Sequence, residues 1–320
     1  MNRIQKYQDS IDKFFKTKLY QTYFNKEEFE NILKYIKKNN FLLTIFLLTL
    51  SNNINKKNKI HQHGYYIGTS LELVLLIIRD IEKENLFKLK KKESNKIINL
   101  INIMLVNNLE QSASILTKDK LLKNYNTTIK NINVKMCTIL ENDNNFDINK
   151  ESFNNTDMCN YKFKNDTYIK KIYSSSKINK DDLNKYIENK YCEITEIASQ
   201  FMWLLGGGNE NQIIYIQKLG RYYGFLIKIF YDLNELEEDI NNDNKINNYY
   251  PNIIINLGIQ ESFECFFYYK KKFIELSIKL GVYSNIIKEL LDYIEEYIDK
   301  FLDNTNKFLD NTNKFLDLDN

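Results

Sequence analysis

The most restrictive feature of this sequence is its shortage of turn-forming residues. Its 320 residues include one proline and nine glycines. A β-rich fold of this length needs many tight turns, and glycine and proline supply a large share of them. Hydrophobic residues make up 43% of the chain, with 23 tyrosines and 20 phenylalanines, so a large core can form. These observations predict an all-α fold.

Apolar residues at helical spacing indicate where the helices lie, and they predict roughly eight to eleven of them. Asn25 is expected to cap the second helix, and the triplet Gly206–Gly208 is expected to end a later one. We expect one helical domain over residues 1–300. The main predicted helices cover residues 4–19, 25–36, 41–50, 65–87, 97–109, 186–205, 212–239, 253–280 and 282–302.

Two regions depart from this pattern. Residues 118–182 are rich in asparagine, aspartate and lysine and show little periodicity, so we interpret them as an enlarged, partly disordered insertion. Residues 301–320 continue a repeat of KFLDNTN that starts at Lys300 and again at Lys307 and Lys314. Its Phe-Leu pairs could extend the last helix as an apolar stripe. Because Asn-Thr-Asn favours helix poorly, we expect a loose tail instead.

The composition argues against several classes of function. The 45 basic and 42 acidic side chains leave a net charge of +3, which is too balanced to indicate nucleic-acid binding. The longest strongly apolar run, residues 41–50, is about half as long as a transmembrane helix must be. No export signal is visible, and the four cysteines form no CxxC pair. We therefore expect unpaired thiols and a cytoplasmic location.

The stretch from Leu219 to Asp239 carries the densest pattern of candidate functional residues. Apolar side chains recur along it at helical spacing, and Asp232, Glu235 and Asp239 fall at i, i+3 and i+7. Three carboxylates on one helical face could bind a hard divalent cation, which prefers oxygen ligands. They could also form a solvated acidic stripe, which is a common role for such a pattern.

This stretch resembles the second signature of the trans-prenyltransferases, the polyprenyl diphosphate synthases of the class I isoprenoid synthase fold. That signature joins a glycine pattern to Phe-Gln and then to Asp-Asp-x-x-Asp. Here Leu219–Gly224 takes the glycine part, and Lys228 stands at the glutamine position. The positions of the three aspartates are occupied by Tyr231, Asp232 and Glu235.

The segment before this stretch is also similar to the family. Residues 186–206 resemble its Lys-Thr helix, with Thr195 at the threonine position and Ile194 where lysine is usual.

The first Asp-rich signature of the family is matched more weakly, by residues 79–85 (RDIEKEN). In the strict register, Arg79 and Lys83 stand at the two outer ligand positions. Shifted by one residue, Asp80 and Glu84 form an i, i+4 pair that could hold a cation. Both registers remain open.

The resemblance implies a divergent Mg²⁺-dependent prenyltransferase of isoprenoid biosynthesis, arranged as a helical bundle around a central apolar cavity. Its substrates would be an allylic prenyl diphosphate and a prenyl acceptor. Mg²⁺ between two acidic helices would neutralise the leaving diphosphate, and the dry cavity would protect the carbocation. The implied metal ligands are Asp80, Glu84, Asp232, Glu235 and Asp239; the implied diphosphate-binding residues are Arg79, Lys83 and Lys228; the implied catalytic residues are Lys228 and Thr195.

Two further functions are compatible with the sequence. The family includes hetero-oligomeric enzymes with motif-poor subunits, so the chain could be a catalytically deficient subunit that supports an active partner. It could also be a helical scaffold unrelated to isoprenoids, with its acidic stripe merely solvated. The resemblance implies a homodimer or a heterodimer with a homologous subunit.

Overall fold

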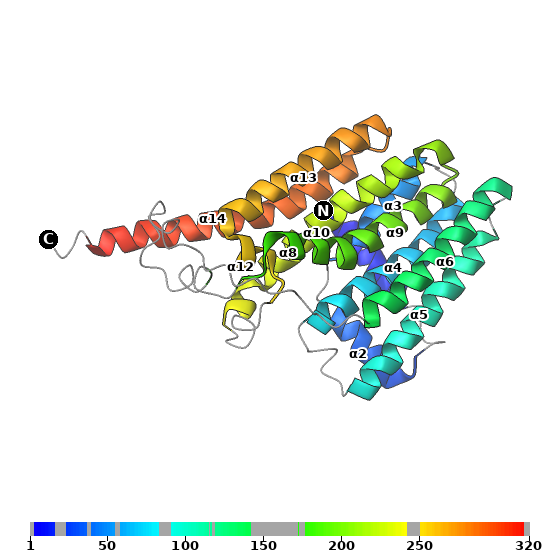
Figure 1. The fold of residues 1–320 in the computed structure, drawn as a ribbon, viewed down its shortest axis with the longest axis horizontal. Coiled ribbons are helices and arrows are strands. Elements are labelled where there is room, and N and C mark those ends of the chain that lie inside the picture. The colour runs from blue at the N-terminus through cyan, green and yellow to red at the C-terminus, as the bar shows by residue number, and fades with distance from the viewer. Residues whose placement is uncertain are drawn as a thin grey trace.

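Helix α10 (Ile213–Ile240) runs through the middle of the computed structural model (Figure 1). It packs against α9 (Glu193–Leu205), α13 (Ile259–Lys279) and α14 (Asn285–Leu316). Within the described part of the chain every regular element is a helix, which confirms the all-α prediction. The structure describes residues 3–16, 24–36, 40–54, 58–82, 91–114, 116, 119–141, 172, 177–241 and 250–316, without the side chains of some helical residues.

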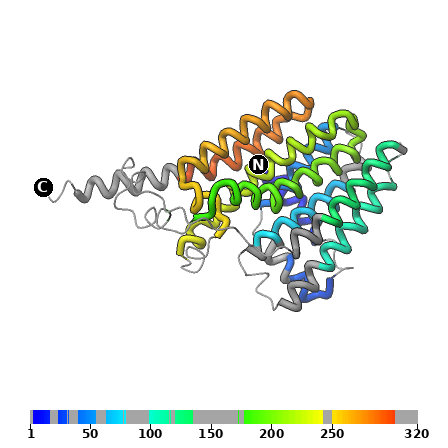
Figure 2. The backbone as a smooth tube through the Cα atoms, viewed as in Figure 1, coloured from blue at the N-terminus to red at the C-terminus, as the bar shows by residue number. Residues whose placement is uncertain are grey.

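The N-terminal half consists of helices that pack in sequence order, α3 on α4, α4 on α5 and α5 on α6. The C-terminal half surrounds α10, and Figure 2 shows α9, α10 and α13 as long neighbouring rods. The remaining bounds are α1 (Arg3–Phe15), α2 (Lys26–Ile36), α3 (Leu42–Ile54), α4 (Asn58–Glu82), α5 (Lys91–Ala113), α6 (Asp119–Glu141), α8 (Lys180–Ile187), the π-turn η4 (Glu188–Cys192), the 3₁₀ turn η5 (Glu210–Gln212) and α12 (Ile253–Leu257).

Two of the predicted helix boundaries have the expected geometry. The Asn25 side chain accepts a hydrogen bond from the Glu28 N–H at 2.9 Å, and the Glu28 carboxylate accepts one from the Asn25 N–H at 3.0 Å. This reciprocal pair is a capping box. Helix α9 ends at the glycine triplet, where Gly207 has a φ of 76° and the Gly208 N–H bonds the Trp203 carbonyl oxygen at 2.9 Å.

Several predicted segments differ from the structure, and helix α4 begins at Asn58 where a start at residue 65 was expected. Residues 119–141 form helix α6 instead of an irregular connection. The predicted helix over 253–280 is broken between α12 and α13 at Gly258, whose φ is 82°. Helix α14 continues to Leu316, so the repeat extends the last helix where a loose tail was expected. For α6, apolar residues at helical spacing form the inner face, and polar residues surround them: Leu121, Tyr125, Ile129 and Ile132.

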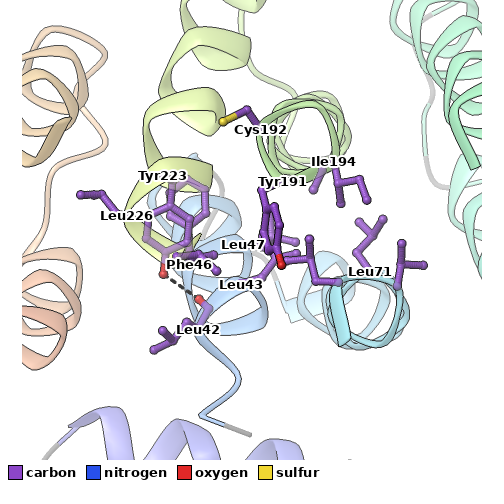
Figure 3. Packing of buried hydrophobic residues seen from close by; sticks show 14 of the residues in the cluster. Leu42, Leu43, Phe46, Leu47, Leu71, Tyr191, Cys192, Ile194, Tyr223 and Leu226 are labelled. Carbon is purple, nitrogen blue, oxygen red and sulfur yellow. Dashed lines mark hydrogen bonds between the residues drawn. The ribbon is translucent and has the colours of Figure 1, made fainter. Parts of the chain in front are cut away.

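The centre of the core is filled by aromatic side chains from α3, α10 and α13. The Tyr223 ring lies 4.2 Å from that of Phe46 and 5.6 Å from that of Phe273, between ring centroids. Its hydroxyl donates a hydrogen bond to the Leu42 carbonyl oxygen at 2.8 Å (Figure 3). Burial raises the pKa of Tyr223 well above its usual value, so this hydroxyl stays protonated and remains a donor.

Two glycines of α10 allow it to approach α9 very closely. A methyl group added at Gly220 would meet the Thr195 carbonyl oxygen and lie 2.8 Å from the Glu196 Cα. One added at Gly224 would lie 2.8 Å from the Cys192 Cα. The glycine pattern at the start of the candidate signature therefore has a packing role, because any side chain would push the two helix backbones apart.

No described helix is long and apolar enough to cross a membrane. Cys192 is buried, Cys265 is partly buried, and neither takes part in a disulfide. The side chains of Cys137 and Cys159 lie outside the described residues.

A buried lysine joins the segment before α8 to helix α12. The Lys177 ammonium group bonds the carbonyl oxygens of Ile172 and Ile255, and the Ile178 N–H bonds the Asn256 side-chain oxygen at 2.7 Å. Burial lowers the pKa of Lys177 from 10.5 to about 7. A neutral amine still has two N–H groups, so both contacts can survive deprotonation.

This lysine leads to a pH-dependent prediction. Since its pKa is about 7 in the fold and 10.5 when exposed, the unfolded chain binds more protons between those pH values. The free energy of unfolding should therefore gain a contribution as the pH rises from about 7 to 10.5. Urea unfolding of the wild-type protein and of Lys177→Met should show a stability difference that changes across this range. A difference that stays constant with pH would contradict the assignment.

Candidate functional site

The acidic end of α10 carries the three predicted carboxylates, and the structure places them in different surroundings. Asp232 is 4% exposed, Asp239 is fully buried, and Glu235 is partly exposed. Helical spacing does put them on one side of α10. Each of them nevertheless has its own protein partners, which come from α4, α10 itself and α12.

Asp232 is held on both oxygens. Its Oδ1 lies 2.8 Å from the Lys228 Nζ, and its Oδ2 accepts a hydrogen bond from the Ile253 N–H at 2.7 Å. The Lys228 ammonium also lies 4.8 Å from the ring centroid of Tyr191, close enough for a cation–π contact. Lys228 is 1% exposed, so this ion pair is part of the core. The structure thus brings two predicted site residues together, as partners of each other.

Glu235 is paired with a residue from another helix. Its Oε1 lies 3.0 Å from the Arg79 Nε of α4, with both side chains less than one-fifth exposed. The Arg79 guanidinium also lies over the ring of Tyr231, 4.5 Å from its centroid. Planar guanidinium groups are well suited to such partly buried positions because they are weakly hydrated. Arg79 therefore links α4 to the acidic end of α10.

Asp239 is connected to the start of α12. Its Oδ2 accepts a hydrogen bond from the Asn252 side-chain amide at 3.0 Å. The Asn252 side-chain oxygen in turn accepts from the N–H groups of Ile254 and Ile255, at 2.9 and 3.2 Å, as the N-cap of α12. Asp232 binds the Ile253 N–H of the same helix, so two of the three carboxylates hold the beginning of α12 in place.

Glu72 is an acidic residue of this region that belongs to neither candidate signature. It is fully buried in α4, and its Oε2 accepts hydrogen bonds from the Thr44 N–H at 2.8 Å and the Thr44 hydroxyl at 3.0 Å. Its Oε1 accepts from the Tyr231 hydroxyl at 3.1 Å. Burial and the nearby Glu72 raise the pKa of Tyr231 well above its usual value. The signal was visible as a lone acid in the apolar run of 71–78.

Neutralising this carboxylate should destabilise the protein. In Glu72→Gln, the amide oxygen can still accept from Thr44, but the NH₂ group then faces the Tyr231 hydroxyl, which must accept from it and leaves its own buried O–H without this acceptor. We expect a loss of about 1–3 kcal/mol in the free energy of unfolding. Chemical denaturation measures it, with Tyr231→Phe as the matched control that removes only one of these bonds. A loss no larger than that of the control would contradict the role given to Glu72.

Thr195 lies where α9 meets α10. Its hydroxyl donates to the preceding turn, where the Tyr191 and Cys192 carbonyl oxygens of η4 lie at 3.0 and 2.9 Å, and the residue is fully buried. It faces the backbone of Gly224, one helical turn before Lys228. The π-turn η4, which precedes α9, supplies the Tyr191 ring that covers the Lys228 ammonium.

The predicted residues of the first signature are only partly described. Arg79 is described, and its guanidinium group pairs with Glu235. Asp80 belongs to α4, but its side chain is not among those that the structure describes. Lys83 and Glu84 lie wholly outside the described residues. Their predicted roles toward a metal and a diphosphate therefore stay predictions.

The donor set at the acidic end of α10 does not fit a bound Mg²⁺. A metal of this kind needs carboxylate oxygens that converge on it at about 2.0–2.1 Å in octahedral geometry. Here Asp232 and Glu235 face cations, and Asp239 faces an amide. Across the described residues, no group of three His, Cys, Asp or Glu side chains is placed to hold a metal ion. These three carboxylates are engaged with partners of the same chain.

The overall fold is similar to that of a solved geranylgeranyl pyrophosphate synthetase. A geranylgeranyl pyrophosphate synthetase from the archaeon Geoglobus acetivorans aligns over 92% of this chain and 97% of its own, with a TM-score of 0.53 and 12% identity. One from Pyrococcus horikoshii aligns over 96% of this chain and 90% of its own, with a TM-score of 0.46 and 13% identity. No family model and no curated protein matches the sequence. The chain therefore has the isoprenoid synthase fold, in a strongly diverged sequence.

Proposed function

We propose that this chain is a catalytically deficient isoprenoid synthase-fold subunit, which acts by supporting a homologous, active prenyl diphosphate synthase. The observation that carries the proposal is the pairing of the acidic end of α10 with cations of the same chain. Lys228 stands 2.8 Å from Asp232, and Arg79 stands 3.0 Å from Glu235. Residues that would need to present oxygens to Mg²⁺ are committed to other partners.

The chemistry of the resembling family explains why this pairing matters. When bound, Mg²⁺ would neutralise the charge that develops on a departing diphosphate. A carboxylate that already neutralises an ammonium or a guanidinium group contributes little to holding that metal, because the two cations would repel each other. What this chain offers instead is the helical framework, in which α10 is joined to α4 and to α12.

A second candidate is the divergent prenyltransferase that the sequence resemblance implies. The specific observation in its favour is that Arg79 is still partly exposed, at 16% of its side chain, at the acidic end of α10. A guanidinium group is a strong partner for diphosphate oxygens. In that case the ligand would have to displace Glu235 from Arg79, and Mg²⁺ would have to be held by the first-signature residues.

One experiment separates these functions. The purified chain is incubated with Mg²⁺, a labelled allylic diphosphate and isopentenyl diphosphate. The assay is repeated after the chain has been coexpressed with a catalytic prenyl diphosphate synthase of its own source organism. The proposal predicts no product from the chain alone, copurification with the synthase, and an altered rate or product length for the complex. Product from the chain alone would overturn it in favour of the transferase. If the chain does not copurify with the synthase, or does not change its rate or product length, the result would favour a helical scaffold with no role in isoprenoid synthesis.

A further inference from the structure

The acidic end of α10 is closed by charges that the chain itself supplies. We propose that Arg79 and Lys228 are resident counter-ions of Glu235 and Asp232, and that they hold this end of α10 without a divalent cation. The inference rests on the proposed function and assigns these two residues a positioning role within it.

Each of the two carboxylates faces a cation of the same chain, and Asp232 is also hydrogen-bonded to the backbone. Asp232 has the Lys228 ammonium on one oxygen and the Ile253 N–H on the other. A metal ion at Asp232 would have to replace at least one of these donors. Replacing Lys228 would leave an ammonium group that is 1% exposed without its carboxylate, which is strongly unfavourable in a protein interior. The existing pair therefore competes effectively with a hydrated cation.

The arrangement also connects three separate elements. Arg79 brings α4 to α10 through Glu235 and through the face of the Tyr231 ring. Asp232 brings α10 to the first turn of α12 through the Ile253 N–H. A metal held between acidic helices would provide a bridge of this kind only when loaded. The resident side chains provide it permanently, so the orientation of α4 relative to α10 should not respond to Mg²⁺.

The direct test is the binding of Mn²⁺, followed by the loss of the aquo-ion signal in electron paramagnetic resonance. The variants are Asp232→Asn and Glu235→Gln, and the matched control is Glu196→Gln, whose carboxylate pairs with Arg221 on the α9–α10 surface. We expect the wild-type protein to bind no more Mn²⁺ than either variant. Binding that is lost in both variants and kept in the control would overturn the inference. If Asp232→Asn does not fold, Glu235→Gln alone decides.

A second measurement tests the counter-ion role of Arg79. Thermal unfolding of the wild-type protein and of Arg79→Gln is recorded in Mg²⁺ and in EDTA. We expect the variant to melt at a lower temperature than the wild-type protein, by the same amount in both solutions. A variant that melts like the wild-type protein, or a wild-type protein that Mg²⁺ stabilises through Asp232, would overturn the role.

The proposed function and this inference fail separately. Product formation by the chain alone contradicts the proposed function, even when no Mn²⁺ binding depends on Asp232. Mn²⁺ binding that depends on Asp232 contradicts the counter-ion role, even when the chain forms no product.

Discussion

Replacing Gly220 with alanine should lower the free energy of unfolding by about 2 kcal/mol or more, although alanine is the better helix former. The added methyl group would lie 2.6 Å from the Ser199 Oγ and 2.8 Å from the Glu196 Cα, and it would also meet the Thr195 carbonyl oxygen. Two of these three atoms belong to the backbone of α9. They can move only if α9 and α10 separate along their length, which would disturb the buried contacts between them.

A glycine of α4 provides the matched control. A methyl group at Gly64 would lie 3.0 Å from the Met202 Cε and 3.1 Å from the Leu48 Cδ2, the flexible ends of two side chains. These ends can adjust, so Gly64→Ala should change stability by less than about 1 kcal/mol. Urea denaturation of both variants measures the difference. Equal stabilities would mean that the close approach of α9 and α10 does not depend on Gly220.

The second large effect concerns the buried ion pair of α10. Lys228→Met should lower the free energy of unfolding by about 3 kcal/mol or more, because it leaves the Asp232 carboxylate in the interior without its cation. Methionine keeps most of the length and apolar volume of the lysine side chain, so the loss would come mainly from charge. The double variant Lys228→Met/Asp232→Asn should lose less than the sum of the two single variants.

An exposed ion pair serves as the control for this cycle. Lys180 pairs with Glu261 at the surface, with both side chains at least 40% exposed. Lys180→Met should therefore cost less than about 1 kcal/mol. Denaturation curves of the wild-type protein, the single variants Lys228→Met and Asp232→Asn, and the double variant give the coupling free energy of the buried pair. Strictly additive losses for Lys228 and Asp232 would show that they do not stabilise each other, and the account of the acidic end of α10 would be wrong.

The helices that could be predicted well are those with a regular apolar period. Helix α10 was placed within a residue of its observed ends, and the Asn25 cap has the expected geometry. Helix α6 was missed although its inward residues fall at i, i+4, i+8 and i+11, because the many asparagine and lysine residues around them were interpreted as the composition of an irregular insertion. The break at Gly258 was also missed, since one glycine in an apolar run is compatible with a continuous helix.

The candidate site could be located from the sequence, but the partners of its residues could not be derived from it. The spacing of Asp232, Glu235 and Asp239 correctly put them on one side of a helix. Arg79 and Asn252 reach them from other helices, and such contacts depend on how the helices pack. The pair of Lys228 and Asp232 is different, because its i, i+4 spacing was available in the sequence. The family resemblance instead directed Lys228 toward a diphosphate.

The central claim is that cations of the chain occupy the acidic end of α10. X-ray diffraction from crystals soaked in Mn²⁺, recorded at its absorption edge, tests this claim most directly. We predict no anomalous density beside Asp232 and Glu235, with the Lys228 Nζ within hydrogen-bonding distance of Asp232 and the Arg79 guanidinium beside Glu235. An anomalous peak coordinated by Asp232 or Glu235, with either cation displaced, would contradict the account.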